Sequence, residues 1–207
     1  MHVIVMAKAP VPGRVKTRLA PEYTFDEAAA LAEAALADTL DAARASAADR
    51  VVVALDGEPG PWLPPGCELV AQRGRGLDER LAAAWTHVGG PGVQIGMDTP
   101  QVTAAHLDAA FASLDGHPAA LGLSTDGGWW AIALHRPDPR AFLGVPMSRE
   151  DTGVRQLARL RSLGLDVAAL PVLRDVDRAP DVPVVSSLAP NGRFARLAAS
   201  MAVLDAR

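Results

Sequence analysis

The sequence predicts an α/β sandwich built around a mostly parallel sheet. Two observations carry this prediction: short apolar runs recur along the 207 residues, and stretches with helical spacing separate most of them. A content of 49% apolar and 21% charged residues is ordinary for a globular protein that buries a core. Because neither repeats nor a low-complexity linker interrupt the chain, we expect one domain.

Each expected strand is a short, mostly apolar run bounded by turn-forming residues. The expected strands are 2–6, 50–55, 67–71, 92–96, 119–124, 129–134 and 166–171. The run "WWAIAL" at 129–134 follows its predecessor too closely for a helical crossover. We therefore expect this strand to run antiparallel or to lie across an edge of the sheet.

The expected helices are the stretches in which apolar residues recur every three or four positions. They are 24–45, 77–88, 103–114, 151–164 and, in the tail, 192–204. Thr24 followed by Glu27 predicts a capping box at the start of the first helix. Gly164 is typical of a helix end and closes the fourth.

The composition excludes several classes of protein. A net charge of −4 gives no general affinity for nucleic acid or for an anionic membrane. No apolar run approaches the roughly 20 residues of a membrane span, and "MHVIVMAKAP" lacks the long apolar core of a signal peptide. Cys67 is the only cysteine, so we interpret it as a buried structural thiol in a cytoplasmic protein. The arginine- and alanine-rich, lysine-poor composition is typical of a GC-rich bacterial genome.

The stretch "AKAPVPGRVKTRLAP" at 7–21 is the most distinctive loop of the sequence. It contains both lysines of the chain and a cluster of cations: Lys8, Arg14, Lys16 and Arg18. Gly13 allows a ligand to approach the backbone closely, while Pro10 and Pro12 stiffen the loop. It is not a Walker A loop, because two residues separate the glycine from the lysine, and it is not the GxGxxG signature of dinucleotide-binding proteins. We interpret it as a phosphate-binding loop; a solvated cationic surface loop is the alternative.

A carboxylate follows the central expected strand in "IGMDTPQ". Asp98 ends this buried strand, where an unpaired charge is costly. Mg²⁺ takes one or two protein carboxylates together with phosphate oxygens, which suits an aspartate that faces a cationic loop. The alternative is that Asp98 caps the next helix, although Thr99 and Thr103 can serve that role.

Two further aspartates occur at a spacing of two in "LRDVDRAPD". On an extended segment this spacing places Asp175 and Asp177 on one face, where they can supply a second ligand to a metal held by Asp98. The residues alone leave open which of the two does so, and a surface turn is the alternative.

The turn "STDGGWW" combines a carboxylate, two glycines and two tryptophans. Asp126 followed by glycines makes a tight, open turn, and the alternation of Trp129 and Trp130 turns one ring inward and one outward. One ring can stack on a base or a sugar, or both can serve packing. The histidines show no metal-ligand spacing.

Five ordered blocks of the chain resemble the DUF2064 proteins. The blocks are "AKAPVPGRVKTRLAP", "QRGRGLDERLAAAW", "IGMDTPQVT", "STDGGWWAIAL" and "LGLDVAALPVLRDVD". The resemblance covers about residues 2–182 and implies a glycosyltransferase-A-like (GT-A-like), Rossmann-like three-layer sandwich, the nucleotide-diphospho-sugar transferase fold. The first block is also distantly similar to the cation-rich loop of 2-phospho-lactate guanylyltransferases. We expect residues 183–207 to form a C-terminal extension whose helix packs on this domain.

The resemblance implies roles for particular residues. The nucleotide phosphates would contact Lys8, Gly13, Arg14, Lys16 and Arg18. Asp98 and the later Asp177 would bind Mg²⁺ or Mn²⁺, and the acceptor pocket would be lined by Asp126, Gly127, Gly128 and Trp129. The catalytic residues would be Lys16, Asp98 and Asp126. Departures from the family pattern concern the acceptor pocket, and they are Met97, Trp129, Trp130 and Met147.

The expected function is nucleotide-dependent transfer. The leading hypothesis is Mg²⁺-dependent nucleotidyl transfer from a nucleoside triphosphate to a small phosphorylated or hydroxylated acceptor, with release of pyrophosphate. One alternative is glycosyl transfer from a nucleotide sugar, and another is a non-catalytic nucleotide-binding protein. We expect small-molecule partners only, without nucleic acid or membrane, and a monomer or homodimer.

Overall fold

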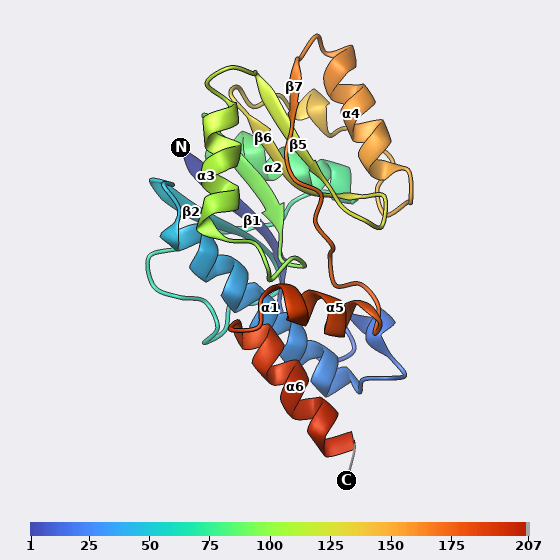
Figure 1. Cartoon of the computed structure of the whole chain (residues 1–207). Helices are drawn as coiled ribbons and strands as arrows, with labels where there is room; N and C mark the ends of the chain where they lie inside the picture. Colours follow the sequence, from blue (N-terminus) through green and yellow to red (C-terminus); the bar gives the residue numbers. More distant parts are fainter. Residues whose placement is uncertain (206–207) are drawn as a thin grey trace.

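The computed structural model describes residues 1–205, in which one mixed sheet of seven strands lies between layers of helices (Figure 1). The strand order is β3-β2-β1-β4-β6-β5-β7. The strands are β1 (His2–Lys8), β2 (Arg50–Asp56), β3 (Glu68–Ala71), β4 (Gly92–Gly96), β5 (Ala119–Leu123), β6 (Trp129–Leu134) and β7 (Val167–Ala169). Only β6 runs against its neighbours within this sheet. The predicted α/β sandwich with a mostly parallel sheet is confirmed.

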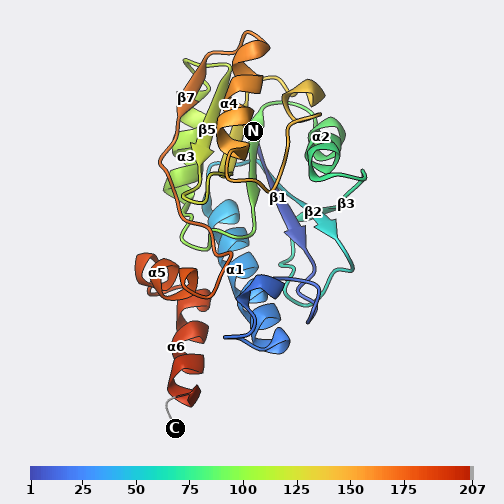
Figure 2. The same cartoon turned by 90° about the vertical axis from the view of Figure 1, so that its right-hand side faces the viewer.

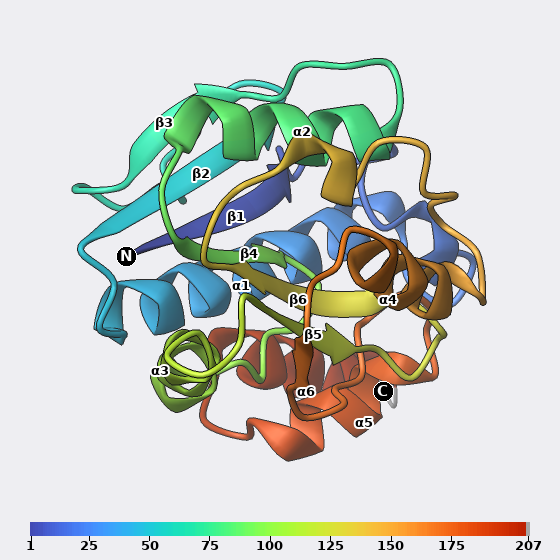
Figure 3. The same ribbon diagram turned by 90° about the horizontal axis from the view of Figure 1, so that it is seen from above.

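Helices cover both faces of the sheet, as the view from above shows (Figure 3). The helices are α1 (Phe25–Ala45), α2 (Leu77–Val88), α3 (Ala104–Ser113), α4 (Thr152–Ser162), α5 (Asp181–Leu188) and α6 (Arg193–Asp205), with short 3₁₀ turns η1 (Thr17–Leu19) and η2 (Pro139–Ala141). One face carries α1 and α3, and the other carries α2 and α4. None of these described helices is both long and apolar enough to cross a bilayer.

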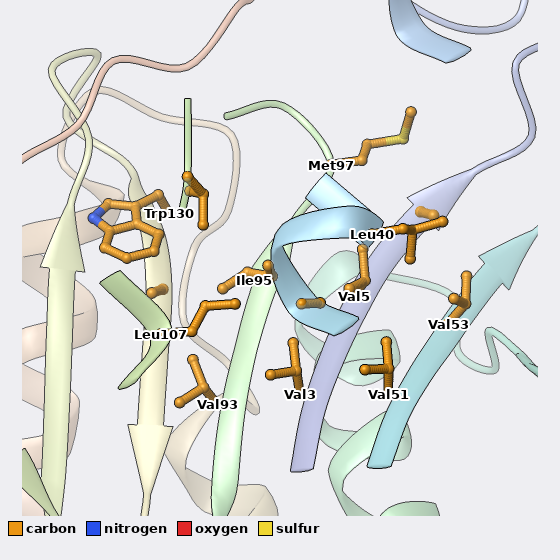
Figure 4. Packing of buried hydrophobic residues seen from close by; sticks show 14 of the residues in the cluster. Val3, Val5, Leu40, Val51, Val53, Val93, Ile95, Met97, Leu107 and Trp130 are labelled. Carbon is orange, nitrogen blue, oxygen red and sulfur yellow. The ribbon is translucent and has the colours of Figure 1, made fainter. Parts of the chain in front are cut away.

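Alternation along β1 divides the core between the two faces. Val3 and Val5 pack with α1 and α3 in one cluster, which Figure 4 shows from close by. Ile4 and Met6 point to the opposite face and pack with α2 residues such as Trp85. This period of two is the pattern expected of a strand that is buried on both sides.

The sequence allowed for the direction of strand β6 but did not predict its position in the sheet. It is antiparallel, one of the two expected arrangements, but it lies inside the sheet between β4 and β5 rather than across an edge. The short connection makes β6 the returning arm of a hairpin with β5, and its other side is free to pair with β4. As a result, the β5–β6 turn lies at the same edge of the sheet as the end of β4.

Local signals account for the helix ends. The capping box is present: Thr24 Oγ1 accepts the Glu27 N–H at 3.2 Å, and Glu27 Oε2 accepts the Thr24 N–H at 2.8 Å. Helix α5 was not predicted, because Pro183 within "DVPVVSSL" suggests a break. Proline is tolerated in the first turn of a helix, where its missing N–H costs nothing.

A third cluster of buried residues joins the C-terminal helices to the start of the chain. It contains Leu19 of η1, residues of α1, Val176, and Phe194 of α6. Figures 1 and 2 show α5 and α6 beside α1. The predicted boundary between residues 182 and 183 lies within α5, and the division itself stays a prediction.

The stability of the fold is expected to decrease in acid through His2. Its side chain is only 4% exposed, lies edge-on to Trp85, and has no hydrogen-bond partner for Nε2 among the described residues. Burial, helped by Arg50, lowers the pKa of His2 from 6.5 to about 4. Below pH 6.5 the unfolded chain therefore binds a proton that the folded chain does not, and stability is lost as the pH falls toward 4.

Urea unfolding at pH 7.5 and pH 4.5 measures this effect. The wild type should lose about 2–3 kcal/mol more than His2→Phe between the two pH values. His135→Phe, a change at an exposed histidine, is the control and should behave like the wild type. Equal pH dependence in wild type and His2→Phe would contradict the prediction.

Candidate functional site

A cavity of about 630 Å³ opens at the carboxyl ends of β1, β2 and β4. In α/β sheets this edge is where ligands bind. The cavity collects most of the residues that the sequence singled out: Lys8, Arg14, Lys16, Arg18, Asp98, Asp126, Gly128, Trp129 and Asp177. Gly13 and Gly127 do not line it, although each shapes a loop that does.

The cationic loop folds back on the other predicted segments. Gly13 turns the chain at φ 72°, and Lys16 adopts the left-handed conformation at φ 49°. The Lys16 side chain is only 9% exposed, with Nζ 2.6 Å from Asp98 Oδ1, and Nζ also donates a hydrogen bond to the Val176 carbonyl. Lys16 is therefore directed toward Asp98 in this structure.

The remaining loop cations differ in their partners. Arg18 Nη1 lies 3.0 Å from Asp177 Oδ2. Within residues 1–205, Lys8 and Arg14 form no ion pair, and both are exposed at the cavity. These two cations are thus available to an anionic ligand.

Three carboxylates gather beyond the end of β4. The backbone carbonyl of Asp98 accepts the Val176 N–H at 2.8 Å, which brings the segment containing Asp175 alongside. Asp98, Asp126 and Asp175 line a recess of about 90 Å³ next to the main cavity. Burial, together with the charges of Asp126 and Asp98, raises the pKa of Asp175 to about 6. The structure thus separates the two later aspartates: Asp175 faces Asp98, and Asp177 faces Arg18.

The recess offers donors of the type that hard divalent cations prefer. Besides the carboxylates it is lined by Thr99, whose buried Oγ1 has no hydrogen-bond partner among the described residues. Across residues 1–205, no three side chains already meet in a complete metal-binding group. This donor set therefore fits Mg²⁺ or Mn²⁺ held by one or two carboxylates, with other oxygens completing the shell.

The β5–β6 turn lines both the main cavity and the recess. Asp126 Oδ1 accepts the Gly128 N–H at 2.8 Å, which fixes the turn. Trp130 is buried and donates its indole N–H to the Pro171 carbonyl at 2.8 Å, while Trp129 lines the cavity. The two rings therefore alternate as expected from the sequence.

Several lining residues were not predicted. Gln72 donates from Nε2 to the carbonyls of Ala7 and Ala54, both at 2.9 Å, at the ends of β1 and β2. Arg80 pairs with Asp56 at 3.0 Å. Gln72 and Arg80 belong to the block "QRGRGLDERLAAAW". This block supports the family resemblance, but the sequence predicted no role for its residues. Arg149 has no motif around it and is located only by the fold.

Gly127→Ala is expected to destabilise the turn by about 2–4 kcal/mol. Gly127 has φ +90°, and an added Cβ would lie 1.8 Å from the Glu150 carbonyl oxygen. The backbone must move, because no side chain can yield. Gly116→Ala is the control, since a Cβ there meets nothing within 4 Å. Thermal unfolding of both variants measures the difference, and equal melting temperatures would contradict the prediction.

The fold and this site define a class of protein. A mostly parallel sheet with one reversed strand, a cationic loop after β1 and a carboxylate after β4 form the nucleotide-diphospho-sugar transferase fold. Residues 25–149 match the family described as an uncharacterised protein conserved in bacteria, DUF2064. The chain therefore belongs to this family, as the sequence resemblance indicated.

Solved structures agree with this fold. A proposed nucleotide-diphospho-sugar transferase from Desulfovibrio desulfuricans G20 is 27% identical, covers 99% of this chain and 95% of its own, and superposes with a TM-score of 0.87. Rv0371c from Mycobacterium tuberculosis H37Rv, in complex with manganese, is 22% identical over 89% of this chain and 96% of its own, with a TM-score of 0.54.

A CMP:2-keto-3-deoxy-manno-octonic acid synthetase complexed with CTP is 14% identical over 91% of this chain and 97% of its own, with a TM-score of 0.51. At this identity, as for Rv0371c, the likeness shows the fold alone. No curated protein was found to match the chain.

Proposed function

We propose that this protein is a transferase that uses a nucleotide with Mg²⁺ or Mn²⁺, and that it transfers a nucleotidyl group from a nucleoside triphosphate to a small acceptor. The observation that carries the proposal is the arrangement within one cavity of Lys8 and Arg14, two cations that form no ion pair in the described part of the chain, beside a recess of carboxylates. The same fold occurs in a synthetase complexed with CTP.

The loop residues bind the phosphates in this proposal. Lys8 and Arg14 contact them first, and Arg18 with Lys16 adds charge when each leaves its aspartate partner. The left-handed conformation of Lys16 is a strained feature of the kind that clusters at functional sites. Gly13, at φ 72°, lets the loop turn so that the residues after it reach the cavity.

The carboxylates hold the cation. Asp98 and Asp175 supply the protein oxygens, since both line the recess, whereas Asp177 is paired with Arg18. The bound cation neutralises charge that develops on the transferred phosphate and on its leaving group. Asp126, fixed by its bond to Gly128, orients the acceptor hydroxyl or phosphate beside Trp129.

Glycosyl transfer from a nucleotide sugar is the second candidate. The 27% identical structure, described as a proposed nucleotide-diphospho-sugar transferase, favours it. In that reaction the cation and the loop hold a diphosphate leaving group, and Asp126 acts as base toward an acceptor hydroxyl. The released product separates the two: pyrophosphate indicates nucleotidyl transfer, and nucleoside diphosphate indicates glycosyl transfer.

A thermal-shift screen of nucleoside triphosphates and nucleotide sugars, each with and without Mg²⁺ or Mn²⁺, tests the proposal. A ligand at 100 times its Kd should add about 2.7 kcal/mol, a shift of about 5–10 °C for a chain of this size. Arg14→Gln should lose the shift, and Arg161→Gln, at an exposed position on α4, should keep it. No metal-dependent shift with any of these compounds would contradict the proposal, and a metal-independent shift without turnover would indicate a non-catalytic nucleotide-binding protein.

A further inference from the structure

The charges that line the main cavity are unevenly paired. Lys16 and Arg80 each have a carboxylate to themselves within residues 1–205, Asp98 and Asp56 respectively. Arg18 pairs with Asp177 at 3.0 Å, and Arg178 approaches the same carboxylate only at 4.0 Å. Lys8 and Arg14 form no ion pair among the described residues and lie together on the cationic loop. The remaining cation, Arg149, comes from the segment before α4. Its one carboxylate partner within residues 1–205 is Asp151, which it shares with Arg155.

Because Asp151 is shared, it neutralises Arg149 only in part. Arg149 Nε lies 3.1 Å from Asp151 Oδ1, while Arg155 Nε lies 2.6 Å from Asp151 Oδ2. Arg149, Arg155 and the carboxylate that they share together carry a charge of +1. Arg149 is 60% exposed, and its two terminal nitrogens have no hydrogen-bond partner within residues 1–205. They are therefore free to bind a ligand.

The backbone holds Arg149 firmly against the predicted acceptor wall. Its N–H donates to Thr152 Oγ1 at 3.0 Å, and Thr152 Oγ1 donates to the Pro146 carbonyl at 3.0 Å. The next residue, Gly153, donates its N–H to the Gly127 carbonyl at 2.8 Å. These hydrogen bonds fix the backbone of the Arg149 segment to the β5–β6 turn, so little backbone ordering of this segment is needed when a ligand binds.

Arg149 thus adds a cation to the cavity apart from the cationic loop, and the carboxylates of the recess adjoin the same cavity. The loop cations serve the phosphates of the donor nucleotide in the proposed function. A neutral acceptor would leave the terminal nitrogens of Arg149 without an anionic partner, whereas a phosphate or carboxylate would find two parallel N–H donors in the planar guanidinium. We propose that Arg149 binds an anionic group of the acceptor substrate; this assignment of the substrate class rests on the proposed transferase function.

Anion titrations of ¹⁵N-labelled protein test the assignment without a known acceptor. Inorganic phosphate and acetate are titrated separately, and the backbone amides of Gly128, Trp129 and Thr152 report binding at this end of the cavity. One of the two anions is expected to bind the wild type more tightly. Arg149→Gln should lower the affinity for that anion by about tenfold or more, since a charge-assisted hydrogen bond is lost. Asp151→Asn should act in the opposite direction and tighten binding by about twofold to fivefold, because it removes the competing carboxylate.

The control is Arg161→Gln, which removes the same charge from an exposed position on α4 and should leave both titrations unchanged. Tighter binding of phosphate than of acetate assigns a phosphorylated acceptor, and the reverse assigns a carboxylic acid. Unchanged affinity in Arg149→Gln, or wild-type amide shifts confined to residues 8–18, would overturn the proposal.

A nucleotide titration of the same variants separates this inference from the proposed function. Arg149→Gln should bind the nucleotide–metal complex as the wild type does. If the wild type binds no nucleotide, the proposed function fails while the anion titrations still decide the role of Arg149. If nucleotide binds but Arg149→Gln has the same anion affinity as the wild type, only the present inference fails.

Discussion

Replacing Asp98 by alanine should abolish the metal-dependent binding of nucleotide and lower the transfer rate by about 10²- to 10³-fold, by analogy with the loss of one preorganised charge-stabilising group. Asp98 lies between the cationic loop and the recess, where its carboxylate contacts Lys16 and faces Asp175. The metal would lose one of its two protein carboxylates. Titration with Mn²⁺ in the presence of the nucleotide found by thermal shift, followed by electron paramagnetic resonance, measures the loss directly.

The control for this experiment is Asp138→Ala. Asp138 is also paired with an arginine, Arg140, but lies outside the cavity. Asp98→Asn serves as a second variant, because it keeps a hydrogen-bond acceptor for Lys16 and so protects the fold. Undiminished Mn²⁺ binding in folded Asp98→Ala and Asp98→Asn would refute the metal assignment.

Replacing Phe194 by alanine should cost about 3–5 kcal/mol of stability, or about 10 °C in melting temperature. The ring is 2% exposed and packs in the cluster that joins α6 to α1, Val176 and Leu19. Leu19 lies in the cationic loop, directly after Arg18, and Val176 lies between the two later aspartates. Nucleotide affinity is therefore expected to fall together with stability.

Leu188→Ala is the matched control, since this leucine on α5 is exposed and its loss should cost less than about 0.5 kcal/mol. Thermal unfolding and nucleotide titration are measured on both variants. A Phe194→Ala protein that melts with the wild type would show that α6 does not belong to the cooperative unit.

Much of the fold followed from local signals in the sequence. Helix 77–88 and strands 92–96 and 129–134 have the predicted bounds because apolar periodicity and flanking glycines act over a few residues. The place of β6 inside the sheet could not be predicted, since it depends on pairing with β4, which is more than 30 residues away. Helix α5 was missed because proline is a breaker everywhere except in the first turn.

The sequence predicted many of the residues of the candidate site, but it could not predict which of them contact one another. Cations after a first strand and a carboxylate after a central strand predict a phosphate and metal site, because the strand ends share one edge of the sheet. The spacing of Asp175 and Asp177 could not assign them different roles, because the roles depend on partners that are distant in sequence. The fold places Asp175 in the recess with Asp98, and it places Asp177 beside Arg18. Arg149 carries no sequence signal, since a lone arginine before a helix is ordinary.

The ion pair between Lys16 and Asp98 affects the order in which the divalent cation and the nucleotide would bind. A buried ammonium already neutralises the carboxylate that the proposed cation needs. A bare divalent ion would have to expel this ammonium and leave it in a secluded position without a counterion. A cation that enters already chelated by a triphosphate brings replacement anions for Lys16 in the same event. The Lys16–Asp98 pair would thus disfavour binding of a free divalent cation. It would open when the complex of nucleotide and cation binds, because this complex supplies a cation for Asp98 and phosphates for Lys16.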